Sequence, residues 1–321
     1  MKTLVLTRAE VERVATMDLA VAAVESAFEA FGRGEASMPA KVYLQIDEYD
    51  GDFRAMPARL GPSAGIKWVN VHIHNPDRYR LPTVMGVYVL NDPRNAFPLA
   101  VMDGTSLTAL RTGAAAGVAS KHLASPSPRT IAFIGAGAQA RTLHGAHRAI
   151  FGSFEALVHD KSAENAALFA SEVGGRVVSL QTAASADIVC TATPSRVPFL
   201  EPDWVTPGAH INAMGADAPG KQELASGLLR AAAVYIDDIH QAEGSGEINV
   251  PLARGEFAID DIAGTLGEVV AGLLPKPADD VTTIFDSTGL AIQDVALARA
   301  IYDEARALGL GVEIDLVGVD G

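Results

Sequence analysis

The feature that most constrains the fold of this chain is the stretch Ile131–Ala146, which reads IAFIGAGAQARTLHGA. Its first four residues are apolar, as in a buried strand, and the glycine-rich turn after them leads into a segment with helical spacing. Gly135 would permit the tight turn, Gly137 would let the backbone approach a pyrophosphate, and Ala140 would let the helix pack closely. The pattern predicts the strand, turn and helix of a dinucleotide-binding fold.

The residues after the turn complete this pattern. A helix that begins near Ala138 and Gln139 would direct free amide groups and a positive dipole end at the cofactor phosphates. The next strand ends in Asp160, about 20 residues further on, where a carboxylate accepts hydrogen bonds from the ribose hydroxyls. A carboxylate there also repels a 2′-phosphate, so NAD is favoured. Lys161 weakens that preference and keeps NADP as an alternative.

The alternation of segments predicts two domains. From Thr130 onward, strand-like and helical runs alternate, which indicates a parallel sheet covered by helices. Residues 38–99 instead contain short β-like runs between Pro, Gly and Asn turns, which favour an α+β domain with an antiparallel sheet. A helix of small residues, 105–124, precedes the linker-like SPSPR, and the last helix could cross back to the first half. We expect an α/β protein with one domain of residues 1–124 plus about 290–321, and a Rossmann domain of residues 125–289.

Composition narrows the class of partner. The chain has 25 basic and 39 acidic residues, a net charge of -14, which repels phosphate backbones and anionic membrane surfaces. We therefore expect a small-molecule substrate and neither nucleic acid nor a membrane. The amino-terminal apolar patch is too short for a signal peptide, and the single cysteine, Cys190, cannot form an internal disulfide, which favours a reducing compartment. We therefore expect a cytoplasmic protein. Cys190 sits in a strand-like run, which favours core packing over catalysis.

Cations on the β-like segments of the first half are candidates for substrate binding. A substrate carboxylate needs a fixed cation, and Lys41, Arg54 and Lys67 are available. Lys67 lies between the apolar runs AGI and WV, where the pKa of a lysine falls and suits it to acid/base work. Each of these residues could instead be a solvated surface charge.

Further candidates follow later strands or share one strand. In NAMGADAPGKQEL, Asp217 and Lys221 flank a Pro-Gly turn on the side of a parallel sheet where ligands bind. Asp217 is either a proton donor or acceptor beside the nicotinamide or the cap of a helix. His72 and His74 alternate on one strand, but no third ligand lies nearby, so we expect no metal and a polar or substrate-lining role.

Six ordered motifs resemble one family. These are GIKWVNVHIHNP, LPTVMGVYVLNDP, PLAVMDGTSLTALRTGAAAG, IGAGAQA, GADAPGKQEL and FDSTGLAIQD. In order and spacing they are similar to the ornithine cyclodeaminase and mu-crystallin family, which includes archaeal-type alanine dehydrogenases and ketimine reductases. The resemblance implies a homodimer whose substrate-binding and dimerisation domains join through their sheets, with NAD(P) bound to the Rossmann domain.

The resemblance also implies roles for single residues. Lys67 matches the active-site lysine and Asp217 the catalytic aspartate, and which of them is the main acid/base stays open. The expected substrate-binding residues are Lys41, Arg54, Lys67 and His72. The expected cofactor-binding residues are Arg111, Thr112, Gly135, Gly137, Ala138, Gln139, Asp160, Lys221, Ser287 and Gly289.

One departure from the family pattern bears on the reaction. Ornithine cyclodeaminases carry a glutamate where this chain has Arg54, so a diamine substrate should be disfavoured. We expect NAD(P)-dependent reduction of a small 2-imino acid to an L-amino acid and the reverse oxidative deamination, as in alanine dehydrogenase or iminosuccinate reductase. His72 and Arg78 raise the option of a second substrate carboxylate. The alternatives are cyclisation of ornithine to proline and a mu-crystallin-like NADP-binding protein.

Overall fold

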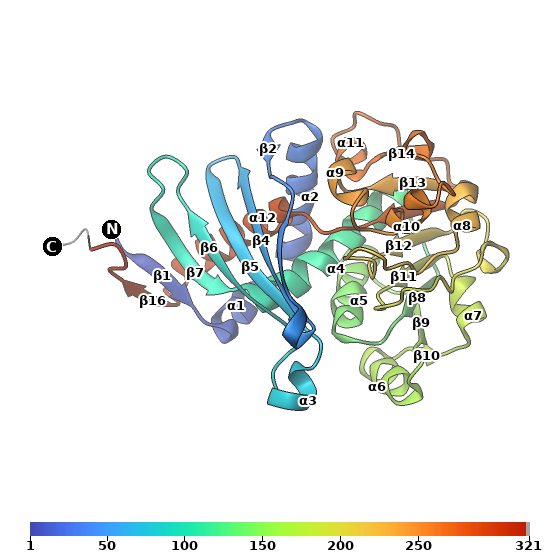
Figure 1. Ribbon diagram of the computed structural model, residues 1–321, viewed down its shortest axis with the longest axis horizontal. Coiled ribbons are helices and arrows are strands. Elements are labelled where there is room, and N and C mark those ends of the chain that lie inside the picture. The colour runs from blue at the N-terminus through green and yellow to red at the C-terminus, as the bar shows by residue number, and fades with distance from the viewer. Residues whose placement is uncertain (319–321) are drawn as a thin grey trace. The chain divides into compact units, whose positions relative to one another are not determined.

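The computed structural model describes residues 1–318, which form two compact units (Figure 1). The first comprises Met1–Arg111 and the segment that begins at Ala291, and the second comprises Thr112–Leu290. The expected boundary after residue 124 therefore falls later than the observed one, which lies inside helix α4 (Gly104–Leu123).

Small residues explain why most of α4 belongs to the second unit. A Cβ on Gly113 would lie 2.4 Å from the carbonyl oxygen of Thr142, on helix α5 (Ala138–Phe151). Gly117 likewise faces Ala146 and Ile150 of the same helix. The two helices approach so closely that only residues without bulky side chains fit between them.

The first unit is built on one sheet, with strand order β16-β1-β7-β6-β5-β4-β2 and with β3 paired to β4. Strands β3 to β7 pair antiparallel, as the sequence predicts, whereas β1 runs parallel to β7. The strands are β1 (Thr3–Leu6), β2 (Ala36–Ser37), β3 (Val42–Ile46), β4 (Gly51–Leu60), β5 (Ser63–His72), β6 (Val84–Asn91), β7 (Pro98–Asp103) and β16 (Val312–Ile314).

Helices cover one face of this sheet. They are α1 (Arg8–Val14), α2 (Met17–Gly32) and α12 (Ala291–Ala307), with the short α3 (Asn75–Tyr79) after β5. Helix α12 packs against α2, β4 and β5, so the last helix returns to the first unit as expected. This return carries side chains from the end of the chain onto the sheet that holds Lys67.

The second unit is a Rossmann fold. Its strands are all parallel, in the order β10-β9-β8-β11-β12-β15-β13-β14. The strands are β8 (Thr130–Ile134), β9 (Glu155–His159), β10 (Arg176–Val177), β11 (Ile188–Thr191), β12 (His210–Ala213), β13 (Ala233–Ile236), β14 (Ile262–Thr265) and β15 (Thr283–Asp286). The helices are α4, α5, α6 (Ala163–Val173), α7 (Leu180–Ala184), α8 (Ser226–Ala231), α9 (Ile239–Ala242), α10 (Asn249–Ala253) and α11 (Leu266–Val270).

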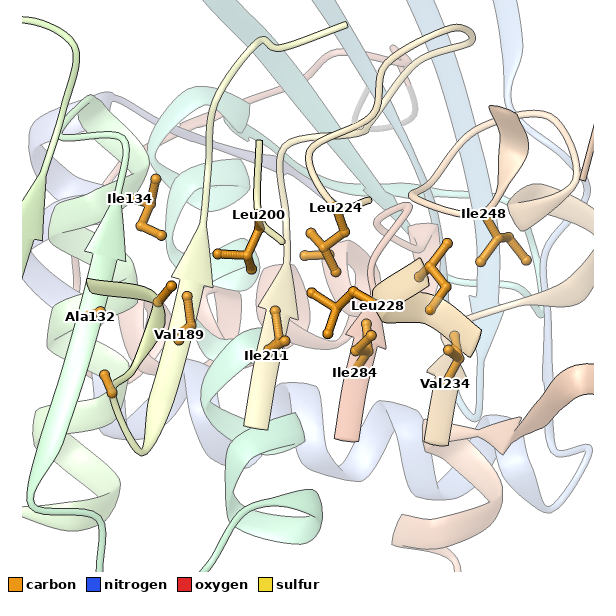
Figure 2. Close-up of a cluster of buried hydrophobic side chains, with 14 of the residues drawn as sticks. Ala132, Ile134, Val189, Leu200, Ile211, Leu224, Leu228, Val234, Ile248 and Ile284 are labelled. Atoms are coloured by element: carbon orange, nitrogen blue, oxygen red, sulfur yellow. The ribbon is translucent and has the colours of Figure 1, made fainter. Parts of the chain in front are cut away.

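Apolar side chains from neighbouring strands form the core of this unit. Figure 2 shows Ala132, Val189, Ile211 and Ile284 side by side along the sheet. Because a parallel sheet is covered on both faces, its strands read as continuous apolar runs. Cys190 follows Val189 on β11 and is buried on the other face of the sheet, near His147 and Asn212. Burial raises its pKa to about 12, and its predicted packing role is confirmed.

No helix in residues 1–318 is both long and apolar enough to span a bilayer.

Candidate active site

Lys67 is the centre of a buried charge cluster in the first unit. Its side chain has no exposed surface, and Nζ donates a hydrogen bond of 2.8 Å to Asp294 on helix α12. Burial, and next the positive charge of Arg111, lower the pKa of Lys67 to about 7, while Asp294 opposes that shift. Lys67 can therefore gain and lose a proton near neutral pH, as the sequence predicts for an acid/base.

Three residues that sequence reasoning missed surround Lys67. Asp294 also accepts a 3.2 Å hydrogen bond from Nε of Arg111, whose Nη1 donates to Gln293 at 3.3 Å. Tyr88 lies directly opposite Lys67 in the β5–β6 register, with its hydroxyl fully buried. Burial, and then the charge of Asp294, hold the pKa of Tyr88 well above its usual value. The sequence did contain a signal for two of them, because Gln293 and Asp294 are polar residues inside the apolar run of the last helix.

Arg111 is an expected cofactor-binding residue, and that role stays a prediction. Within the first unit its guanidinium pairs with two side chains of α12, Asp294 and Gln293. The pairing makes Arg111 part of the electrostatic setting of Lys67, because its charge acts on the pKa of that lysine.

Arg54 shares a sheet face with Lys67. Met56 stands opposite Lys67 in the β4–β5 register, and Arg54 precedes Met56 by two residues, so all three point to the buried face. Asp52 holds the guanidinium with two hydrogen bonds of 3.0 Å, and the Tyr43 ring lies 5.2 Å from it. The arginine is therefore fixed in place, as recognition of a carboxylate requires.

Lys41 belongs to the same group of cations. It precedes β3, and its charge is close enough to lower the pKa of Lys67. The structure thus brings Lys41, Arg54 and Lys67 together, which the sequence could suggest only from residue types.

His72 does not join this group. It follows Lys67 by five residues on β5 and therefore points to the opposite face of the sheet. There its ring packs edge-on against the Phe53 ring, with 5.5 Å between the two ring centroids. There it lines a cavity of about 200 Å³ with His74 and Arg78 among others. His72 and Lys67 thus lie on opposite faces of β5, and a substrate-lining role for His72 stays a prediction.

The two histidines also form no metal centre with other ligands. His74 pairs with Asp50 at 3.0 Å. Nowhere in residues 1–318 do three or more His, Cys, Asp or Glu side chains group in a way that could hold a metal ion.

The second unit contains a cavity of about 690 Å³ at the carboxyl ends of β8, β9 and β11. The chain proceeds from β8 outward on one side and resumes with β11 on the other, and such a switch point is where open parallel sheets bind ligands. The lining includes Gly135, Gly137, Asp160, Lys161 and Thr193.

The glycine turn has the geometry that a dinucleotide needs. Gly135 has a φ of +98°, and a Cβ there would lie 2.6 Å from the carbonyl oxygen of Ala192. At Gly137, which caps α5, a Cβ would meet nothing within 4 Å, so the backbone there is open to a ligand. Ala138 and Gln139 form the first turn of α5 as predicted.

Asp160 is held against this turn. Its carboxylate accepts hydrogen bonds of 2.7 Å from the backbone amides of Ala136 and Ser162. The group is thus fixed at the end of β9, in the position predicted for an adenosine ribose ligand. These residues fit a bound dinucleotide.

The remaining predicted residues lie on neighbouring loops or on α4. Lys221 donates to Asp217 at 2.5 Å across the turn that follows β12, so the structure brings this predicted pair together. Ser287 and Gly289 follow β15, and the amide of Gly289 donates to Asp237 at 2.7 Å. Thr112 is buried on α4.

Comparison with known proteins places this geometry in a family. The chain is 47% identical over 320 residues, covering 98% of each protein, to an alanine dehydrogenase of Archaeoglobus fulgidus. A solved structure described as an archaeal alanine dehydrogenase dimer with bound NAD is similar with a TM-score of 0.95 and 46% identity, over 98% of this chain and all of that one.

A second solved structure extends the comparison. The NAD⁺ complex of an iminosuccinate reductase of Paracoccus denitrificans has a TM-score of 0.92 and 30% identity, over 98% of this chain and 100% of that one. The profile of the ornithine cyclodeaminase/mu-crystallin family matches residues 1–309. The chain therefore belongs to the ornithine cyclodeaminase/mu-crystallin family, as its six motifs predict.

Proposed function

We propose that the protein is an NAD-dependent oxidoreductase that interconverts a small monocarboxylic 2-imino acid and its L-amino acid. The observation that carries this proposal is the buried Lys67, whose pKa of about 7 suits an acid/base, on the same sheet face as the fixed guanidinium of Arg54. One group can move the substrate proton and the other can hold the substrate carboxylate. The alanine dehydrogenase and iminosuccinate reductase relatives support this class of reaction.

In this proposal bound NADH would supply the hydride for reduction and bound NAD⁺ would accept it in oxidation, while the side chains bind the substrate and move protons. In the oxidative direction, Lys67 takes a proton from the substrate ammonium group before hydride leaves the α-carbon. Water then hydrolyses the imine to the 2-oxo acid and ammonia. In the reductive direction, protonated Lys67 supplies the proton that keeps the imine cationic while it accepts hydride. We assign the main acid/base role to Lys67, because its pKa is about 7 and it shares a sheet face with the guanidinium of Arg54.

The side chain of the substrate follows from charge. Arg54 is the guanidinium on the Lys67 face, and Asp52 already neutralises part of its charge. His72 and Arg78, which would have favoured a second carboxylate, line a cavity that includes the opposite face of β5. A monocarboxylic substrate such as the imine of pyruvate or glyoxylate therefore fits better than a dicarboxylic one.

Three further proposals concern the cofactor, the oligomeric state and the location of the protein. Asp160 favours NAD over NADP by charge repulsion of a 2′-phosphate. The outer face of the first sheet exposes Val42, Leu44, Trp68 and Val87, each at least 44% exposed, and an apolar face of this kind suits a homodimer interface. The solved alanine dehydrogenase is described as a dimer. We also propose a cytoplasmic location, because a chain with a single cysteine forms no internal disulfide and suits a reducing compartment.

The experiment is loss of NADH absorbance by purified protein with ammonium and pyruvate, glyoxylate or oxaloacetate, with proline formation from ornithine and NAD followed in parallel. We expect a monocarboxylic oxo acid to give the fastest rate. Proline formation with no signal from any oxo acid would instead identify a cyclodeaminase.

The Lys67→Gln variant, which retains an N–H donor for Asp294, separates an enzyme from a binding protein. We expect it to lose roughly a hundredfold or more in turnover while NADH binding is unchanged. If the parent protein binds NADH but oxidises none of it with any of the oxo acids, the proposal is contradicted.

A further inference from the structure

The carboxylate of Glu223 is fully buried at the carboxyl-end edge of the Rossmann sheet and joins two loops. One oxygen accepts hydrogen bonds of 2.7 Å from both the amide and the hydroxyl of Thr193. The other accepts from the Thr191 hydroxyl at 2.6 Å and from the amide of Gly215 at 2.9 Å. All four neighbours donate, so an ionised carboxylate satisfies them and an amide would not.

Each of these loops carries part of the candidate site. Thr193 lines the cofactor cavity. The carbonyl oxygen of Ala192, the residue before it, lies against the backbone of Gly135 in the glycine turn. Gly215 lies two residues before Asp217 on the loop that also carries Lys221. Glu223 therefore connects the wall of the cofactor cavity with the loop of the second predicted catalytic residue.

The two loops meet so closely that side chains are excluded at the contact. A Cβ on Gly215 would lie 2.3 Å from the carbonyl oxygen of Thr193 and 2.5 Å from the carboxyl carbon of Glu223. Burial raises the pKa of Glu223, and the four hydrogen bonds oppose that rise by stabilising the ionised form. Such an arrangement is costly unless every donor is present.

We propose that Glu223 is a positioning residue for the cofactor site, which holds the Thr193 loop against the glycine turn and sets the place of the Asp217 loop. The inference rests on the proposed function, because it takes the cavity lined by Gly135 and Asp160 to be the NAD site. It adds a residue that touches neither cofactor nor substrate and acts through Thr193 and Gly215.

The test compares NADH binding, by fluorescence titration, in the full-length protein and in matched variants. Glu223→Gln keeps the size of the side chain but turns an N–H₂ group toward two donors, and we expect the Kd for NADH to rise roughly tenfold. Thr191→Val removes one donor without disturbing the strand and should raise the Kd by roughly threefold, whereas Thr191→Ser keeps the hydroxyl and should bind as the parent protein does.

The control is a partly buried carboxylate at the opposite edge of the sheet, which also accepts hydrogen bonds from backbone amides. Asp187, just before β11, accepts hydrogen bonds from the amides of Arg129 and Thr130 at 2.7 and 2.9 Å. Asp187→Asn should lower the melting temperature yet leave the Kd for NADH unchanged. In turnover, Glu223→Gln should raise KM for NADH and lower kcat, with KM for the oxo acid unchanged, since Arg54 belongs to the other unit.

The outcomes separate the two proposals. Parent protein that binds no NADH would refute the proposed function. Parent protein that binds NADH, with Glu223→Gln and Thr191→Val binding equally well, would refute only the role of Glu223. Equal weakening in Asp187→Asn and Glu223→Gln would also refute it, because loss of stability alone would then explain the effect. If Glu223→Gln does not fold, the contrast between Thr191→Val and Thr191→Ser decides.

Discussion

Replacing Asp294 by Asn tests the electrostatic reasoning about Lys67 most directly. The carboxylate lies 2.8 Å from Nζ and raises the pKa of Lys67, against burial and the charge of Arg111, to a net value of about 7. An opposite charge at such a distance shifts a pKa by roughly one to three units. Asp294→Asn should therefore lower the pKa of Lys67 to between roughly 4 and 6, a change of about 1.4 to 4 kcal/mol.

The assay is the pH dependence of kcat/KM in both directions. Oxidation requires neutral Lys67, so its rate should rise with pH through a limb near 7, and Asp294→Asn should move that limb toward acid. Reduction requires protonated Lys67, and at pH 7 its rate should fall roughly fivefold or more because the protonated fraction drops. Arg111→Met should move the same limb the other way, since it removes a charge that lowers the pKa of Lys67.

Asp303→Asn is the matched control. Asp303 lies on the same helix, is exposed and pairs with Arg299 at 2.8 Å, so its loss should leave the limb unmoved. A limb that stays in place in Asp294→Asn, or moves toward alkaline pH, would show that Asp294 does not set the protonation of Lys67.

Three further perturbations have definite expected results. Asp160→Ser should shift the ratio of kcat/KM for NADPH over NADH upward by roughly tenfold, and an unchanged ratio would contradict the charge argument. Trp68→Glu places a charge on the exposed apolar sheet face and should convert a dimer to monomer in sedimentation, whereas an unchanged mass would exclude that face as the interface. Burial lowers the pKa of His147 to about 4, below the roughly 6.5 of an unfolded chain, so acid favours unfolding through this group only below pH 6.5. Between pH 6.5 and 4 this effect should lower the free energy of unfolding by about 3 kcal/mol. In urea unfolding, the free energy of His147→Gln should fall less over this pH range than that of the parent protein, and equal falls would refute the assignment.

The local pattern of the sequence determined the Rossmann half. Strand, turn and helix are short-range features, and Gly135 is needed in the turn because its φ is positive and a Cβ would meet the carbonyl oxygen of Ala192. The place of Asp160 directly after β9 also follows from the local pattern, because it depends only on where that strand ends. The same alternation of side chains along β5 could have separated His72 from Lys67, since residues five apart on a strand point to opposite faces.

Long-range packing decided the chemistry of the first half. Asp294 is 227 residues from Lys67 in the chain and meets it only because α12 returns to the sheet. The apolar flanks of Lys67 predicted a lowered pKa, but its value near neutrality comes from the balance between full burial, Arg111 and Asp294. Glu223 is likewise an ordinary charged residue in the sequence. Its role appears only where two loops and a strand end converge on one buried carboxylate, because desolvation and hydrogen bonding depend on neighbours that the chain brings together by folding.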